Sequence, residues 1–182
     1  NLGLEVESKD SRFRVALDFF RKNGKDIIGN SPVPRSIGVA SVRGNFASVQ
    51  TSGLDMELNA KILQGPFRWD SRYLISLVRE KVVSYETEVN PSDYLNGNVL
   101  TLPIPGKPLF SVFSLPFAGL DPATGDPLGY LNGEPSSDYG AIFSQLTEED
   151  VRYHGPSRPT VFGALTNNFS WKNFNLSVNI SY

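Results

Sequence analysis

Residues 168–182 read NFSWKNFNLSVNISY, and this stretch decides the fold class of the chain. After four turn-forming residues, every second side chain is apolar: Phe174, Leu176, Val178, Ile180 and Tyr182. The residues between them are asparagine and serine. Such alternation indicates a β-strand with one apolar face, because successive side chains of a strand point to opposite sides. At about 3.3 Å per residue this strand rises about 26 Å.

The first residues of the chain show the same period. One segment alternates through Leu2, Leu4 and Val6, and the next through Phe13, Val15, Leu17 and Phe19. Between them, SKDS at 8–11 is composed of good turn formers. A hairpin folded there is predicted to set Glu7 opposite Arg12 and Glu5 opposite Arg14. Facing opposite charges contribute about 0.2–1 kcal/mol per pair and support this register.

Two more hairpins complete the predicted sheet. In the middle one, residues 54–62 and 67–77 alternate on either side of the turn LQGP, and Glu57 is predicted opposite Arg72. In the last one, Phe169 is predicted opposite Phe174. The hairpins cover about residues 1–22, 46–85 and 158–182. They predict an all-β fold of about six antiparallel up-and-down strands.

Connection lengths favour a membrane barrel. The turns within hairpins are tight, whereas the connections at about 21–45 and 86–157 are long and rich in glycine and proline. Outer-membrane barrels alternate short periplasmic turns with long external loops in this way. Aromatic residues gather beside the tight turns, as expected of an interfacial girdle: Phe67, Trp69, Phe169, Trp171 and Phe174. Tyr85 and Tyr182 lie toward the other ends of their strands.

Composition excludes several classes of protein. Hydrophobic residues make up 40% and charged residues 20% of the 182 positions, and the net charge is −2. No apolar run approaches the roughly 20 residues of a membrane-spanning helix. The charge gives no footprint for nucleic acid, and the absence of cysteine excludes disulfide and thiol chemistry. Because Asn1 opens directly into strand-like sequence, we expect the chain to be an excerpt of a larger protein.

A soluble carbohydrate-binding β-sandwich is the alternative interpretation. Alternating strands also build sandwiches, in which the apolar face is a closed core. Against this stand the asymmetric connections and the lengths of segments 48–62 and 67–85. Strands in globular proteins have a mode of about 5–6 residues, whereas tilted barrel strands need roughly 9–11 to cross a bilayer. The barrel is therefore favoured.

Several ordered motifs resemble one known family. GKPLFS at 106–111, followed by FAGLDPATGDP at 117–127, closely resembles a motif of the SusC-like (SusC/RagA) TonB-dependent transporters. YHGPSRPTVFG at 153–163 looks like the family's entry to a strand, and NFSWKNFNLSV at 168–178 is similar to the hairpin that follows. DFFRKN at 18–23 fits the same order. The resemblance spans nearly the whole chain.

The resemblance implies a function and a place in the cell. The chain would be a barrel-wall segment, with long extracellular loops, of a Gram-negative outer-membrane nutrient importer. Such a receptor takes up glycan, oligosaccharide or peptide with a SusD-like surface lipoprotein and is driven by the TonB system. The family's N-terminal and plug domains and most of its barrel strands, about 22 in all, are not in this sequence. No enzyme activity is expected, and Tyr182 is read as an accidental stop.

Some residues suggest a site, but each has a simpler interpretation. Asp121, Asp126 and Asp138 resemble calcium ligands, yet their spacing fits no EF-hand, and Asp-Pro is an ordinary turn former. His154 is the only histidine, which excludes a histidine cluster or a Ser-His-Asp triad within the chain. The acids at 148–150 are interpreted as a solvated patch. Catalytic, metal and cofactor sites are therefore predicted to be absent, and the substrate-binding residues are unknown.

The charged and aromatic side chains leave alternatives open. Four arginines could contact anionic substrate in the lumen, but pairing with Glu5, Glu7, Glu57 and Asp70 is favoured; they are Arg12, Arg14, Arg68 and Arg72. Four loop aromatics could stack on sugars, contact a lipoprotein cap or pack the loop onto itself: Tyr130, Tyr139, Phe143 and Tyr153. On the strands, the apolar face is predicted to meet lipid and the polar face the lumen. Leu58, Ile75, Leu176 and Val178 belong to the first; Glu57, Arg72, Ser177 and Asn179 belong to the second.

Overall fold

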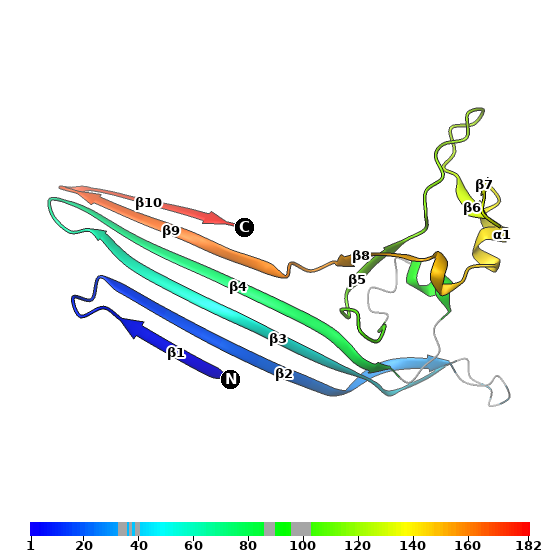
Figure 1. Ribbon diagram of the computed structural model, residues 1–182, viewed down its shortest axis with the longest axis horizontal. Coiled ribbons are helices and arrows are strands. Elements are labelled where there is room, and N and C mark those ends of the chain that lie inside the picture. Colours follow the sequence, from blue (N-terminus) through cyan, green and yellow to red (C-terminus); the bar gives the residue numbers. More distant parts are fainter. Residues whose placement is uncertain (33–35, 37, 39–40, 86–89, 96–102) are drawn as a thin grey trace. The chain divides into compact units, whose positions relative to one another are not determined.

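The chain forms one six-stranded antiparallel sheet in the computed structural model, which describes residues 1–32, 36, 38, 41–85, 90–95 and 103–182. The strands, in spatial order, are β1 (Leu2–Glu7), β2 (Phe13–Pro32), β3 (Ser41–Leu63), β4 (Phe67–Tyr85), β9 (Val161–Trp171) and β10 (Phe174–Ser181). Each strand lies beside the one that precedes it in this order (Figure 1). The predicted all-β, up-and-down arrangement is confirmed.

Two compact units divide the chain. The first comprises Asn1–Gly24, Gln50–Glu80 and Pro159–Tyr182, and so contains the tight turns of the three predicted hairpins. The second comprises Lys25–Val49 and Lys81–Arg158. The motifs at 106–111 and 117–127 belong to this second unit.

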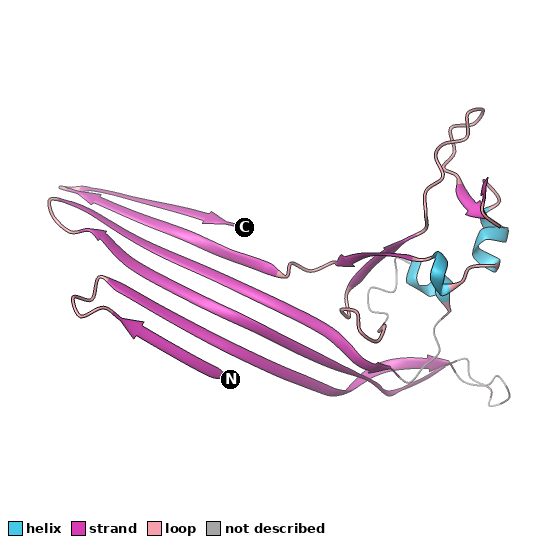
Figure 2. Cartoon of the chain, in the orientation of Figure 1, coloured by secondary structure: helices cyan, strands magenta, loops and turns pink. Residues whose placement is uncertain are grey.

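Secondary structure of the second unit occupies much of the predicted loop at 86–157. β5 (Ser111–Ser114) pairs with β8 (Arg152–Pro156), and β6 (Gly129–Leu131) pairs with β7 (Glu134–Ser136). The short helices are η2 (Pro91–Leu95), α1 (Tyr139–Ser144) and η3 (Glu148–Asp150); Figure 2 draws helices in cyan. Residues 86–89 and 96–102 of the predicted loop lie outside the described residues. No helix among the described residues is long and apolar enough to cross a membrane.

The predicted connection at 21–45 is wrong in its bounds. β2 continues to Pro32 and β3 begins at Ser41, so strand occupies much of this range. The apolar alternation ends at Phe19, and the sequence prediction ended the strand with it. Backbone pairing does not require an apolar face, because the ladder is made by main-chain N–H and C=O groups. Residues 33–35, 37, 39 and 40 of this connection lie outside the described residues.

The first hairpin is shifted by two residues from its predicted register. Glu7 pairs with Arg14 rather than with Arg12, and Val6 pairs with Val15. The cause is a wider turn: the Ser8 hydroxyl accepts hydrogen bonds from the backbone N–H groups of Arg12 and Phe13, at 3.1 and 3.0 Å. A shift of two leaves every side chain on its predicted face.

The last hairpin is shifted in the same way. Phe174 pairs with Trp171, and Phe169 pairs with Leu176, because the turn has two residues instead of four. Lys172 adopts the left-handed φ of 52° that a short hairpin turn requires. The predicted pairing of Phe169 with Phe174 is therefore wrong. Glu57 and Arg72, which were predicted to face each other, form an ion pair with 3.0 Å between Glu57 Oε1 and Arg72 Nε, a contact that diagonal neighbours on adjacent strands can also make.

The sheet of the first unit has no core of its own. The buried apolar side chains of the described chain are Ala47, Val49, Val82 and Ile142, and all four belong to the second unit. The strands of the first unit lie side by side in a single layer (Figure 1). A sandwich requires a second sheet packed on the apolar face, and the described residues supply none.

A first prediction concerns the isolated polypeptide of these 182 residues. It should not be a stable monomer in water, because its sheet ends at β1 and β10 with open edges and exposes its apolar face. Size-exclusion chromatography without detergent is expected to show aggregates, and added detergent should reduce them. Cooperative thermal unfolding of a detergent-free monomer would contradict the barrel interpretation and favour a sandwich.

Candidate functional site: the two faces of the sheet

One face of the first unit is apolar across adjacent strands. In antiparallel pairs, residues directly opposite one another share a face. The register pairs Leu4 with Leu17 on β1 and β2, and it aligns Tyr73, Leu165 and Ile180 across β4, β9 and β10. Large side chains on this face remain exposed, with Leu2 at 73% and Phe174 at 74%. Exposed apolar area on this scale marks an interaction surface.

Aromatic rings gather on the apolar face beside the tight turns. Phe67, Trp171 and Phe174 are aligned across β4, β9 and β10. The Phe169 ring stacks on Phe67, with centroids 6.2 Å apart, and on Trp69 at 5.6 Å. The predicted cluster is confirmed. An aromatic belt at this place suits a membrane interface, where rings with one polar edge are favoured.

Gly163 on β9 makes room for a second aromatic pair. The Tyr73 and Tyr182 rings stack with centroids 6.4 Å apart, and their hydroxyl oxygens are 2.6 Å apart. A Cβ atom at position 163 would lie 2.8 Å from the Tyr182 hydroxyl oxygen and would also collide with the Leu74 carbonyl oxygen. Only glycine therefore fits between these groups without a shift of the backbone.

Asn167 is a polar residue on the apolar face, and the sequence interpretation missed it. It pairs with Ser71 on β4 and Val178 on β10. Its side-chain oxygen accepts a hydrogen bond from Trp69 Nε1 at 3.0 Å. The signal was available in the adjacent Asn167 and Asn168, because two consecutive residues of a strand must occupy opposite faces.

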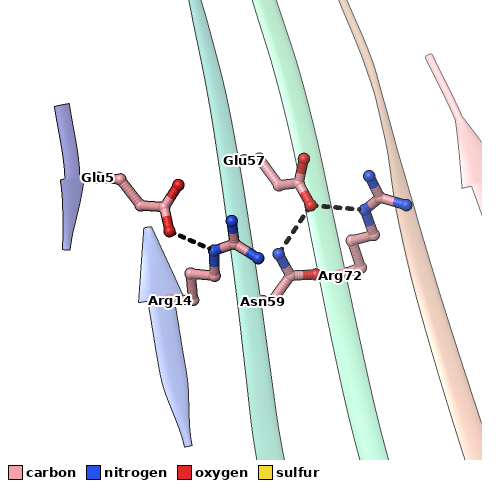
Figure 3. A network of polar contacts seen from close by, with 5 residues as sticks. All are labelled: Glu5, Arg14, Glu57, Asn59 and Arg72. Carbon is pink, nitrogen blue, oxygen red and sulfur yellow. Dashed lines mark hydrogen bonds and ion pairs between the residues drawn. The ribbon is translucent and has the colours of Figure 1, made fainter. Parts of the chain in front are cut away.

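The opposite face carries a network of charged side chains (Figure 3). Arg14 Nε lies 2.9 Å from Glu5 Oε1, and Arg72 Nε lies 3.0 Å from Glu57 Oε1. Asn59 Nδ2 donates a further hydrogen bond of 2.7 Å to the same Glu57 oxygen. These five residues come from β1, β2, β3 and β4, and their formal charges cancel.

Polar residues continue this face across the remaining strands. Arg72 aligns with Thr166 and Asn179, and the Thr166 hydroxyl lies 3.2 Å from the Asn179 side-chain oxygen. Asp70 aligns with Asn168 and Ser177. The two predicted faces are thus confirmed as faces of one sheet.

The predicted pairing of the arginines is confirmed for Arg14 and Arg72. Arg12 differs: its guanidinium donates to the backbone carbonyls of Lys61 and Ile62, at 3.4 and 3.0 Å. It therefore ties the first turn to the end of β3. Arg68 aligns with Ser170 on the polar face.

A second prediction concerns this network. Glu57→Gln removes the charge that Arg72 contacts and is expected to destabilise the intact barrel by about 0.3–1 kcal/mol, because half-exposed ion pairs contribute little. Urea unfolding of the intact protein at low and high salt measures it, and salt should shrink the difference. Ser177→Ala, on the same face without a charge, is the control. A loss of several kcal/mol would show that the network is structural.

Three acidic residues of the second unit, Asp121, Asp138 and Asp150, serve its turns and caps. The Asp121 carboxylate accepts from the backbone N–H of Ala123 at 2.7 Å, and Asp138 caps α1 by accepting from Ala141 N–H at 2.9 Å. The Asp150 carboxylate accepts from the Thr147 hydroxyl, which lowers the pKa of Asp150 below its ordinary value. Among the described residues no group of three metal-ligating side chains comes together.

The remaining candidate residues contact their own loop. His154 Nε2 lies 2.7 Å from the Ser114 hydroxyl, across the β5–β8 pair. Tyr153 stacks on Phe113 at 5.6 Å, and the Tyr139 hydroxyl donates to the Pro127 carbonyl at 2.7 Å. Tyr130 lines a hollow of about 380 Å³ together with Leu115, Ile142 and Asp150. Phe143 is exposed at 46%.

A single-layer antiparallel sheet with an exposed apolar face, an aromatic belt and a polar opposite face has the architecture of a β-barrel wall. Comparison with known proteins agrees. The chain is 22% identical, over 98% of its length, to the TonB-dependent receptor P3 of Formosa agariphila, and 26% identical over 48% to the receptor P39 of that bacterium. It spans 19% of the first and 9% of the second. No protein-family model matches.

Solved structures show the same fold. The RagAB peptide transporter matches 98% of the chain with a TM-score of 0.72 and 22% identity, and the open-open RagAB peptide importer matches 99% with 0.75 and 22%. The chain covers 19% of each. The resemblance read from the sequence is therefore confirmed: the chain matches a barrel segment of a SusC/RagA-like TonB-dependent transporter. These relatives are named as receptors and transporters, not as enzymes.

Proposed function

We propose that this chain forms part of the barrel wall of an outer-membrane, TonB-dependent nutrient importer of a Gram-negative bacterium. Its apolar face contacts lipid, and its charged face lines the lumen. The observation that supports this is the exposed apolar face, which continues across paired strands. On the opposite face, the charged side chains form ion pairs with one another. A soluble module would leave that face in water, at a cost of about 25 cal/mol for each Å² of apolar area.

Dimensions agree with this assignment. On β4 the apolar face runs from Phe67 to Leu77, which is about 33 Å along the strand at 3.3 Å per residue. A strand tilted by roughly 40° carries that length through about 25 Å of membrane, the height of the apolar band in such barrels. The long connections then belong to one side. We assign the loop at 86–157 to the extracellular side, because tight turns mark the periplasmic side.

Labelling of single cysteines tests which face meets lipid. The chain has no cysteine, so Leu176→Cys and Ser177→Cys can be placed in an intact transporter that lacks others. We expect a lipid-soluble maleimide to label position 176 and a water-soluble one to label position 177. Fluorescence of a probe at 176 should be quenched by nitroxide lipids. Labelling of both positions by the water-soluble reagent would reject the proposal.

The cargo and partners are assigned by the same proposal. The RagAB structures are named as peptide importers, which supports peptides as cargo; glycans and oligosaccharides stay a second class. A SusD-like surface lipoprotein is expected over the extracellular mouth, and the TonB system is expected to act through parts of the transporter outside this chain. Deleting the gene of the intact transporter should abolish uptake of one class of cargo, either peptides or glycans and oligosaccharides. Affinity purification of the intact transporter should recover the lipoprotein.

A further inference from the structure

The apolar face of the first unit stops along one row. On β2 the alternation Leu17, Phe19 is followed by Arg21, and on β4 Leu77 is followed by Arg79. On β3, read toward its start, Leu54 is followed by Ser52. The period of two is unbroken at each of these steps. Arg21, Ser52 and Arg79 therefore continue the face that carries the apolar side chains.

These three residues lie in one row across the sheet. Gly53 lies between the neighbouring strands: a Cβ atom there would collide with the Phe20 ring on β2 and would lie 2.7 Å from the Leu77 carbonyl oxygen on β4. Two hydrogen bonds give the register of β2 and β3: the Lys61 backbone N–H donates to the Arg12 carbonyl, and the Gln50 side-chain amide donates to the Asn23 side-chain oxygen. Gly163 makes the same contact with the Leu74 carbonyl and pairs with Ile75, the next residue of β4. By the same geometry Gly53 pairs with Val78, so Ser52, one residue earlier, aligns with Arg79 on β4 and with Arg21 on β2. The two arginines are thus two strand spacings, about 10 Å, apart.

The two guanidinium groups differ from those of the polar face. Arg21 and Arg79 are exposed, and within the described part of the chain no acid forms an ion pair with them, whereas Arg14 and Arg72 are both paired. The nearest acids along the three strands point to the opposite face, because each is an odd number of residues away from the row: Asp18 on β2, Asp55 on β3 and Glu80 on β4. The row therefore presents two positive charges and a hydroxyl, with apolar side chains immediately beside it.

We infer that this row binds the phosphate of an anionic lipid headgroup; the inference rests on the proposed function, because it needs the adjacent apolar face to meet acyl chains. A lipid against that face places its headgroup phosphate at the edge of the apolar band. Guanidinium groups bind phosphate through paired N–H donors. Two of them about 10 Å apart reach one phosphate between them over Ser52. Long basic side chains that only extended into water would show no preference among headgroups.

Lipid titration of the intact transporter tests the inference. Dioctanoyl-phosphatidylglycerol is added to the protein in an uncharged detergent, and bound lipid is counted by native mass spectrometry. Dioctanoyl-phosphatidylcholine provides the neutral headgroup. Each basic residue near a membrane surface contributes about a fivefold factor in affinity for anionic lipid, so Arg21→Gln with Arg79→Gln is expected to weaken phosphatidylglycerol binding about thirtyfold. Phosphatidylcholine binding should not change.

A matched control removes the same charge from the other face. Lys61→Gln with Arg68→Gln lies on the polar face and is expected to bind phosphatidylglycerol as the unmodified protein does. Arg21→Lys with Arg79→Lys, which keeps the charge, should retain most of the affinity and shows that the row tolerates substitution. Equal phosphatidylglycerol affinity in the Gln pair and its control would overturn the inference. If a probe at Leu176 is still quenched by lipid, that result leaves the proposed function intact.

Discussion

Val178→Arg is expected to destabilise the intact barrel by about 2–4 kcal/mol, the largest effect predicted for a single substitution in this chain. Val178 lies in the middle of β10 and pairs with Asn167, so it shares the face of Phe169 and Leu176. A guanidinium group at that depth must either lose its hydration or thin the bilayer around it. The fraction of folded, membrane-inserted protein, read by heat-modified mobility in gels and by urea titration, measures the loss.

Asn179→Arg is the matched control, one residue further along the same strand. Asn179 pairs with Thr166 on the polar face, where an added charge remains in water. The yield of folded protein should stay close to that of the unmodified transporter, within about 0.5 kcal/mol as for ordinary surface substitutions. Equal tolerance of arginine at 178 and 179 would mean that the apolar face does not meet lipid, and the transporter function would be rejected with it.

Gly163→Ala is expected to cost about 1–3 kcal/mol, as overpacking of a tight contact does. The added methyl group would collide with the Leu74 carbonyl of the neighbouring strand and would lie 2.8 Å from the Tyr182 hydroxyl. Relief requires moving either the β4 backbone or the Tyr182 ring, and the latter breaks its hydrogen bond to Tyr73. Equilibrium unfolding in urea of the intact protein, with its midpoint and slope, measures the change.

Gly65→Ala is the control for that substitution. Gly65 lies in the turn between β3 and β4, and a Cβ atom there would meet nothing closer than 4.0 Å. Its unfolding midpoint should therefore match that of the unmodified protein. If Gly163→Ala were as stable as Gly65→Ala, the close approach of β4 and β9 at Gly163 would not exist in the folded barrel.

Side-chain chemistry and turn geometry contributed differently to the register. The sequence predicted Glu5 beside Arg14, and the two form an ion pair although they do not face each other directly; Glu5 pairs with Ala16. Long side chains reach diagonal neighbours on an adjacent strand, so a matching pair of charges is compatible with more than one register. Charge pairing alone therefore could not distinguish the predicted register from one shifted by two.

By itself, the sequence determined the fold class, the two faces and the family resemblance. The period of two assigns each side chain of a strand to a face, and shifts by an even number of residues preserve that assignment, as they do for Val6 and Phe174. Tertiary structure alone decided the exact pairing of the strands, because the turns at Ser8 and Lys172 set the register of the first and last hairpins. It also decided where β2 and β3 end, because backbone hydrogen bonds extend these strands beyond the apolar alternation. It alone also aligned Arg21 with Arg79, since residues this far apart in the chain become neighbours only when strands pair.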